Sequence, residues 1–227
     1  MEGMHKHRKT IQGTLLAGLI ILSIASLAAA PGLGMRNAIA PTPTPTVPPF
    51  PRLLKVKTLL QSSYTSCGEA AITMAYNYAN LEAPIEEQVV IDYAREQGYF
   101  TERRWPFTSP ENMLKIAEHF SKDLRTGTVT TQDEGLAMLI DQLREGEPII
   151  IDVLARFYDP DSPAHFILVT GVSRDPARGN AVMIHFNDPL SGNSRISRWD
   201  GNEGVWHAWK TNNDPGGSGW WLVIPPP

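Results

Sequence analysis

The chain has only one cysteine, Cys67, among its 227 residues. A single cysteine cannot form a disulfide within the monomer, so structural bridging is excluded. Its sulfur is therefore either a small buried hydrophobe or a reactive group. The sequence also lacks the Cys and His spacing of a metal site, and we expect neither a metal nor an organic cofactor.

Basic residues are scarce beyond the N-terminus. From residue 41 onward the chain has 16 Lys and Arg against 23 Asp and Glu, and the basic residues form no cluster. Nucleic acid and anionic lipid are therefore poor partners. With 42% hydrophobic residues the chain can form one packed core. We expect a monomer whose partner is a peptide or protein substrate.

The N-terminal 51 residues divide into two parts. Residues 1–30 join a basic start to the apolar run Leu15 to Ala30, which predicts a signal peptide or an uncleaved signal anchor. Residues 31–51 are a linker that ends in "PTPTPTVPPFP", a composition typical of a stiff polyproline spacer. Residues 52–227 then form the folded domain. We expect it to be extracytoplasmic, either secreted or tethered to the outer face of the membrane through the N-terminal segment alone.

The hydrophobic period changes midway along the domain. Helical spacing and start signals predict four helices, over 66–79, 85–97, 109–120 and 131–144. Apolar runs between turn signals predict four strands, over 148–157, 165–174, 181–189 and 220–225. A helical first half followed by an antiparallel second half indicates an α+β fold.

Cys67 lies where the first helix is predicted to begin. Ser66 and Glu69 have the spacing of a capping box, with Ser66 as the N-cap and Cys67 as the first helical residue. The unpaired N–H groups and the positive end of the helix dipole favour a thiolate at this position. The site is therefore suited to covalent catalysis.

A nucleophilic thiolate needs a base and an acceptor that orients it. His165 begins the most hydrophobic strand, and Asp188 ends the following one. If the two strands pair through the "DPARGN" turn, the two side chains meet, and we expect a bond from Nδ1–H of His165 to the carboxylate. Both residues also have structural alternatives: a strand-end histidine, and a turn-forming Asp before Pro189.

The ordered motifs "QSSYTSCGEAA", "HFILVTGV" and "NDPLSG" resemble the papain-like cysteine peptidases of the bacteriocin-processing (double-glycine peptidase-like) family, in a stand-alone exported form. The resemblance implies a papain-like fold, with the helical half packed on the antiparallel sheet. It also implies that Cys67 is the nucleophile, His165 the base, Asp188 the orienting residue and Gln61 a support for the oxyanion. The chain lacks the transmembrane bundle and nucleotide-binding domain of the transporter-linked members, so double-glycine cleavage does not carry over.

Two other functions are open on the sequence alone. A cell-wall amidase or transpeptidase could use the same Cys67 and His165 pair. A non-catalytic module on a peptidase scaffold could bind peptides or glycans through its six tryptophans, although these could equally be core residues.

Overall fold

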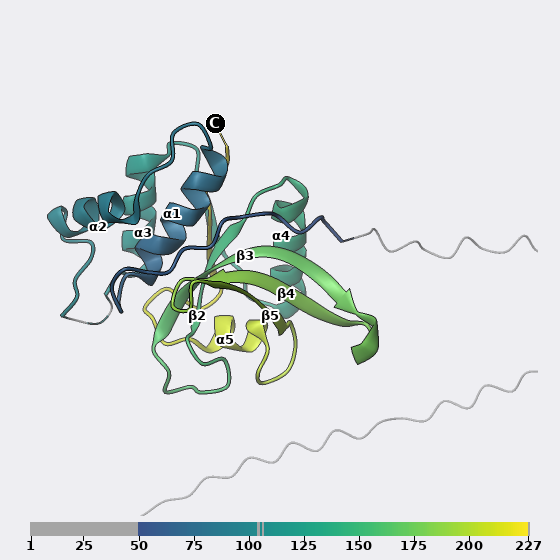
Figure 1. The fold of residues 1–227 in the computed structure, drawn as a ribbon. Helices are drawn as coiled ribbons and strands as arrows, with labels where there is room; N and C mark the ends of the chain where they lie inside the picture. Colours follow the sequence, from purple (N-terminus) through teal and green to yellow (C-terminus); the bar gives the residue numbers. More distant parts are fainter. Residues whose placement is uncertain (1–49, 104, 106, 227) are drawn as a thin grey trace, which may run out of the picture. The chain divides into compact units, whose positions relative to one another are not determined.

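The computed structural model describes residues 50–103, 105 and 107–226 (Figure 1). The predicted signal segment and nearly all of the predicted linker lie outside these residues. Within them, no helix has both the length and the apolar character needed to cross a membrane.

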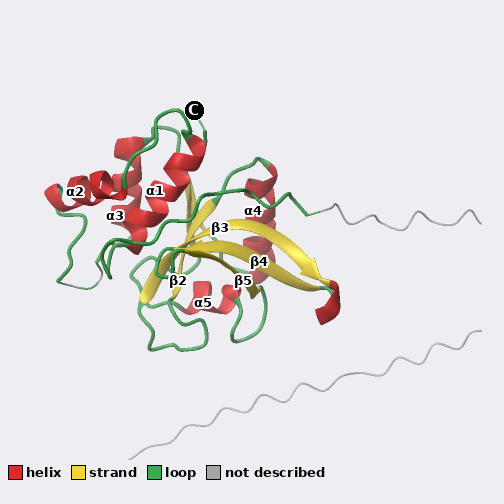
Figure 2. Ribbon diagram, in the orientation of Figure 1, coloured by secondary structure: helices red, strands yellow, loops and turns green. Residues whose placement is uncertain are grey.

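The described residues form five α-helices, a short 3-10 helix and one six-stranded sheet (Figure 2). The helices are α1 (Cys67–Ala79), α2 (Glu87–Glu96), α3 (Pro110–Phe120), α4 (Gln132–Arg144) and α5 (Val205–Thr211), with η1 at Pro176–Arg178. The strands are β1 (Arg125–Thr128), β2 (Ile149–Leu154), β3 (Ala164–Asp175), β4 (Ala181–Asp188), β5 (Asn193–Arg198) and β6 (Trp220–Val223). They pair antiparallel in the order β1-β6-β2-β3-β4-β5. The α+β prediction is confirmed.

Local signals set the ends of two helices as predicted. Ser109 caps α3 by accepting a hydrogen bond from the Asn112 backbone N–H, and Pro110 occupies the first turn. Thr131 and Glu134 form a complete capping box at the start of α4. Beyond the end of α4, Gly146 adopts a φ of 85°, which a residue with a side chain rarely adopts.

Helices cover both faces of the central sheet. On one face α1, α2 and α3 bury a core that includes Ile150, Phe166 and Leu168. On the other face α4 and α5 pack on a second core that includes Ile151 and Ile167. Because β2 and β3 are buried on both faces, their sequences are almost continuously apolar. The predicted packing of helices on the sheet is thus confirmed, with α4 and α5 on the face opposite α1.

A β-bulge in β3 controls which residues of β3 and β4 share a face. The pairing runs Leu168 to Asn187 and Val169 to Phe186, and then shifts so that Gly171 pairs with His185. A one-residue shift moves side chains to the other face of a strand. The pairing of Leu168 with Asn187 places the next residue of β4, Asp188, opposite Ile167. Side chains alternate between the two faces of a strand, so His165 and Ile167 share a face, and Asp188 lies on that same face.

The extended segment 53–61 crosses the sheet and leads to α1. Its Leu54 N–H donates to the carbonyl of Thr170, the residue at the bulge, and Gln61 N–H donates to Pro189 O, each at 2.9 Å. Gly192, at a φ of 67°, leaves room for Leu60, because a Cβ there would lie 2.8 Å from Leu60 Cβ. This segment therefore joins the chain before Cys67 to the turn after Asp188.

Candidate active site

Cys67 is the first residue of α1, as predicted, and its side chain is half-buried. The predicted capping box is wrong: Ser66 makes no side-chain cap, and Glu69 turns inward to accept a hydrogen bond from Thr108 Oγ1 at 2.6 Å. Burial raises the pKa of Glu69 to about 7. No side chain therefore caps the first N–H groups of α1, where Cys67 lies. These N–H groups favour a negative charge on the sulfur of Cys67.

Glu87, the first residue of α2, holds the segment before Cys67 in place. Its carboxylate accepts hydrogen bonds from Ser62 N–H at 3.0 Å and from Ser66 Oγ at 2.8 Å. Glu87 is buried, so these bonds are shielded from water. The buried carboxylate thus fixes the residue next to Cys67.

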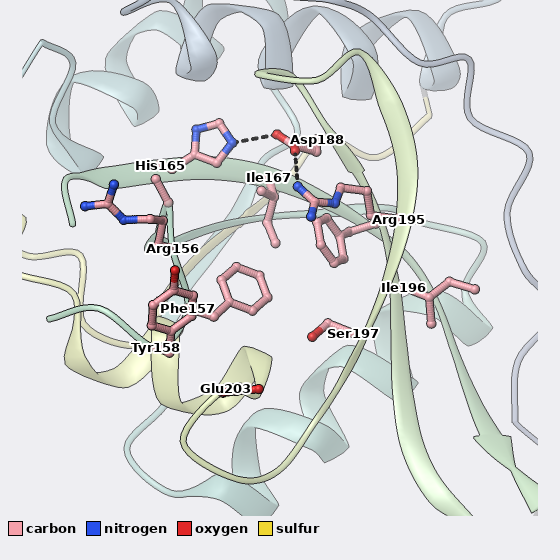
Figure 3. Close-up of a pocket in the computed structure, with 12 residues that line it drawn as sticks. Arg156, Phe157, Tyr158, His165, Ile167, Asp188, Arg195, Ile196, Ser197 and Glu203 are labelled. Atoms are coloured by element: carbon pink, nitrogen blue, oxygen red, sulfur yellow. Dashed lines mark hydrogen bonds and ion pairs between the residues drawn. The ribbon is translucent and has the colours of Figure 1, made fainter. Parts of the chain in front are cut away.

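His165 and Asp188 meet at the ends of β3 and β4, as predicted (Figure 3). Nε2 of His165 lies 2.8 Å from Asp188 Oδ1, and both side chains are buried. The prediction named the wrong imidazole nitrogen, because Asp188 bonds Nε2 rather than Nδ1. This arrangement leaves Nδ1 for Cys67, which lies near enough to the ring to raise the pKa of His165.

Asp188 accepts hydrogen bonds from four groups. Besides His165, they are Leu190 N–H at 3.0 Å, Ser191 Oγ at 2.9 Å and Arg195 Nη1 at 3.0 Å. Burial alone would raise the pKa of Asp188, but His165, Arg195 and Ser191 outweigh it and hold that pKa well below its usual value. Asp188 is therefore both the turn-former and the acceptor for His165.

The electrostatics of His165 favour the imidazolium. Burial alone would lower its pKa, but hydrogen bonds to Asp188 and Cys67 and their negative charge raise the pKa of His165 to about 9. At neutral pH the ring is therefore positively charged. A positive ring beside the sulfur stabilises a thiolate.

Gln61 is buried beside the segment that leads to Cys67. Its Nε2 donates one hydrogen to Ser63 O at 2.8 Å and keeps a second N–H. Its Oε1 is buried without a hydrogen-bond donor among the described residues. The structure thus brings Gln61 to the same end of the sheet as the Pro189 turn, to which its backbone is bonded.

A cleft of about 360 Å³ opens beside His165. Phe157, Ile167 and Phe186 provide apolar lining, and Arg156 and Arg195 add positive charge (Figure 3). A second, much smaller pocket is lined by Cys67 itself, together with Phe166 and Asp214. His165 and Asp188 thus line one hollow, and Cys67 lines another.

Two other histidines of the domain, His119 and His185, have partners of their own. His119 stacks on Tyr93, with ring centroids 3.7 Å apart, and His185 shares a hydrogen bond with Ser173 Oγ.

Trp199, Trp209 and Trp220 are buried, which fits the prediction of core residues better than that of a binding surface.

Sequence reasoning missed several polar residues around the site. They are Glu87, Asp152, Ser191, Arg195 and Asp214. Asp152 had a visible signal, because it is the one charged residue within the apolar run of β2. Arg195 had none, because β5 has no apolar face and was not predicted as a strand.

A family model described as the Peptidase_C39 like family matches residues 53–213, most of the chain. The chain belongs to this family. Its membership confirms the papain-like peptidase resemblance and supports a function of the cysteine-peptidase type. No curated protein matches the chain. The matched residues of this Peptidase_C39-like domain include Gln61, Cys67, His165 and Asp188.

Proposed function

We propose that this protein is an exported cysteine peptidase that hydrolyses peptide bonds through Cys67, His165 and Asp188. The observation that carries the proposal is the position of one imidazole between two partners. His165 bonds Asp188 through Nε2 at 2.8 Å, and Cys67 lies near enough to the same ring to raise its pKa. This is the arrangement of nucleophile, base and orienting residue that thiol catalysis requires.

The acylation step follows from these groups. The Cys67 thiolate attacks the carbonyl carbon of the scissile bond, and His165, as imidazolium, gives its proton to the leaving amine as the C–N bond breaks. Asp188 holds the ring orientation and stabilises its charge. The product is a thioester on Cys67. His165, now neutral, accepts a proton from the water that hydrolyses this thioester, and the cycle closes.

The oxyanion needs hydrogen-bond donors near Cys67. In this proposal they are the Cys67 backbone N–H, at the first position of α1, and the second N–H of Gln61 Nε2. Preorganised donors of this kind lower the barrier because they need not reorient as charge develops.

Export is the part of the proposal supported by the N-terminal sequence. The basic start, the apolar run of residues 15–30 and the Pro/Thr-rich linker are typical of a segment that directs or tethers a domain outside the membrane. Fractionation of expressing cells, with N-terminal sequencing of the protein recovered, tests this part separately from the chemistry.

The chemistry is tested with the full chain and a library of internally quenched peptides. We expect cleavage by the wild type, loss of cleavage in Cys67→Ala, and inhibition by an epoxide that modifies Cys67. Purified peptidoglycan is the parallel substrate. Turnover of peptidoglycan without cleavage of any peptide would favour the amidase or transpeptidase alternative. Peptide binding that survives Cys67→Ala, with no turnover of either substrate, would favour the binding module.

A further inference from the structure

Asp214 lines the small pocket next to Cys67, and nothing in the proposed mechanism uses it. The residue is only 6% exposed, yet its Oδ1 receives no hydrogen bond from the described residues. A buried carboxylate without donors is costly unless a partner arrives from outside. An unpartnered acid that lines a pocket indicates a ligand that supplies the donors.

Asp152 is a second buried acid that interacts with Asp214. It is fully buried, and neither of its carboxylate oxygens has a hydrogen-bond donor among the described residues. Gly217 packs against it so closely that a Cβ there would collide with Asp152 Oδ2. Burial, with the charges of Asp214 and Cys67, raises the pKa of Asp152 well above its usual range. Burial raises the pKa of Asp214 to about 6.

The size and the walls of the pocket limit what can enter. The hollow measures about 20 Å³, the space of a single water-sized group. Trp105, Phe107 and Phe166 contribute aromatic walls. Aromatic faces attract cations, and a primary ammonium is much more compact than a guanidinium. The net charge of the chain, –4, also favours a positively charged ligand.

We propose that Asp214, backed by Asp152, is a specificity-determining site that binds a primary ammonium group of the substrate next to Cys67. The ammonium belongs either to a lysine side chain near the scissile bond or to the N-terminus of a short peptide. This inference rests on the proposed peptidase function and adds a substrate class to it. The ammonium would donate a hydrogen to the carboxylate of Asp214, the acid that lines the pocket.

The first test uses the wild-type full chain and needs no variant. Matched peptides carry lysine, Nε-acetyl-lysine or norleucine at each position flanking the scissile bond, and a second set has a free or an acetylated N-terminus. We expect kcat/KM to be about tenfold to a hundredfold higher for the peptide with the relevant ammonium, since a hydrogen bond to a charged group has that effect. The two sets tell a lysine side chain from an N-terminus, and a preference in either supports the site.

The second test assigns the preference to Asp214. Asp214→Asn keeps the shape of the side chain and removes its charge, so the ratio of kcat/KM for the ammonium-bearing peptide to that for its norleucine or acetylated counterpart should fall to about one. Asp141→Asn, an exposed change on α4 on the opposite face of the sheet, is the control and should keep the preference. The thermal midpoint of each variant is measured alongside. If Asp214→Asn does not fold, the acetyl-lysine comparison in the wild type decides alone.

The outcomes separate this inference from the function on which it rests. Cleavage of neutral and ammonium-bearing peptides at equal rates overturns the ammonium site and leaves the peptidase. A preference that survives in folded Asp214→Asn also overturns it. Failure to cleave any peptide, with Cys67 unreactive, removes both.

Discussion

His165 and Asp188 are 23 positions apart in the chain, yet Nε2 of one lies 2.8 Å from Oδ1 of the other. The contact depends on the shift in register between Val169 and Gly171, which places both side chains on one face of the sheet. Asp188 also accepts the Leu190 N–H of its own turn. One carboxylate thus shapes the turn and orients the imidazole.

Replacing Asp188 by Asn should reduce turnover while the domain stays folded. Asn keeps the size and an acceptor oxygen, but it removes the charge that stabilises the imidazolium. We expect kcat/KM to fall about tenfold to a thousandfold, or roughly 1.4 to 4 kcal/mol of barrier. Asp200→Asn is the matched control, because Asp200 is half-exposed and pairs with Arg198. If Asp188→Asn keeps full activity, or loses it only in step with its thermal midpoint, Asp188 serves the turn alone.

Arg195→Met should affect catalysis more than stability. Arg195 donates to Asp188 Oδ2, but its own side chain is 59% exposed. A solvent-exposed ion pair contributes up to about 1 kcal/mol to stability, so the thermal midpoint should change little. Losing one of four donors loosens Asp188, and we expect kcat to fall about twofold to tenfold. Arg198→Met, on the same strand, should keep wild-type kinetics. Equal kinetics for both variants would show that Arg195 does not position Asp188.

Glu87→Ala should disrupt the segment that precedes Cys67. Its removal leaves the Ser62 N–H and the Ser66 hydroxyl without their buried acceptor. We expect a loss of about 2 to 6 kcal/mol in the free energy of unfolding, because each of the two donors left without its acceptor costs roughly 1–3 kcal/mol. Glu86→Ala changes the exposed neighbour, which makes no side-chain cap, and should be nearly neutral. Denaturant unfolding of both variants makes the comparison, and similar losses in the two would contradict the role of Glu87.

Glu69→Gln should stabilise the domain at alkaline pH. Burial raises the pKa of Glu69 from 4.5 to about 7, so between these values the folded state holds a proton that the unfolded state releases. The free energy of unfolding therefore falls as the pH rises from 4.5 towards 7, and the full loss remains above pH 7. Gln carries no charge and can still accept from Thr108 Oγ1.

We expect Glu69→Gln to gain about 1 to 3 kcal/mol over the wild type at pH 8 and to lose this advantage at pH 4.5. Thermal midpoints across this range measure the difference. Glu118→Gln, an exposed change on α3, is the control. A constant difference between Glu69→Gln and the wild type at all pH values would mean that Glu69 does not titrate as described.

The sequence was most informative where a pattern is local. The caps at Ser109 and Thr131 and the apolar runs of β2 and β3 predicted these elements within a few residues. β1 and β5 were missed because "RTGT" is very short and "NSRISR" has no apolar face. α5 was missed because it has only seven residues and no side-chain cap.

The candidate site likewise combines residues that local sequence patterns predicted with contacts that they did not. Cys67, His165 and Asp188 stand at element ends that the sequence marks, and the structure brings them together. The choice of Nε2, the contact of Arg195 with Asp188 and the inward turn of Glu69 depend on pairing between distant segments. No local pattern carries that information.

The reactivity of Cys67 towards an alkylating agent as a function of pH tests the central claim most directly. An ordinary thiol has a pKa of about 8.5 and reacts slowly at pH 6. If the His165 imidazolium and the start of α1 stabilise the thiolate, Cys67 should alkylate rapidly at pH 6, and His165→Ala should slow that reaction at least about tenfold. Mass spectrometry of the full chain gives both rates, since Cys67 is its only thiol. A wild-type profile that follows an ordinary thiol, unchanged in His165→Ala, would contradict the assignment of Cys67 as the nucleophile.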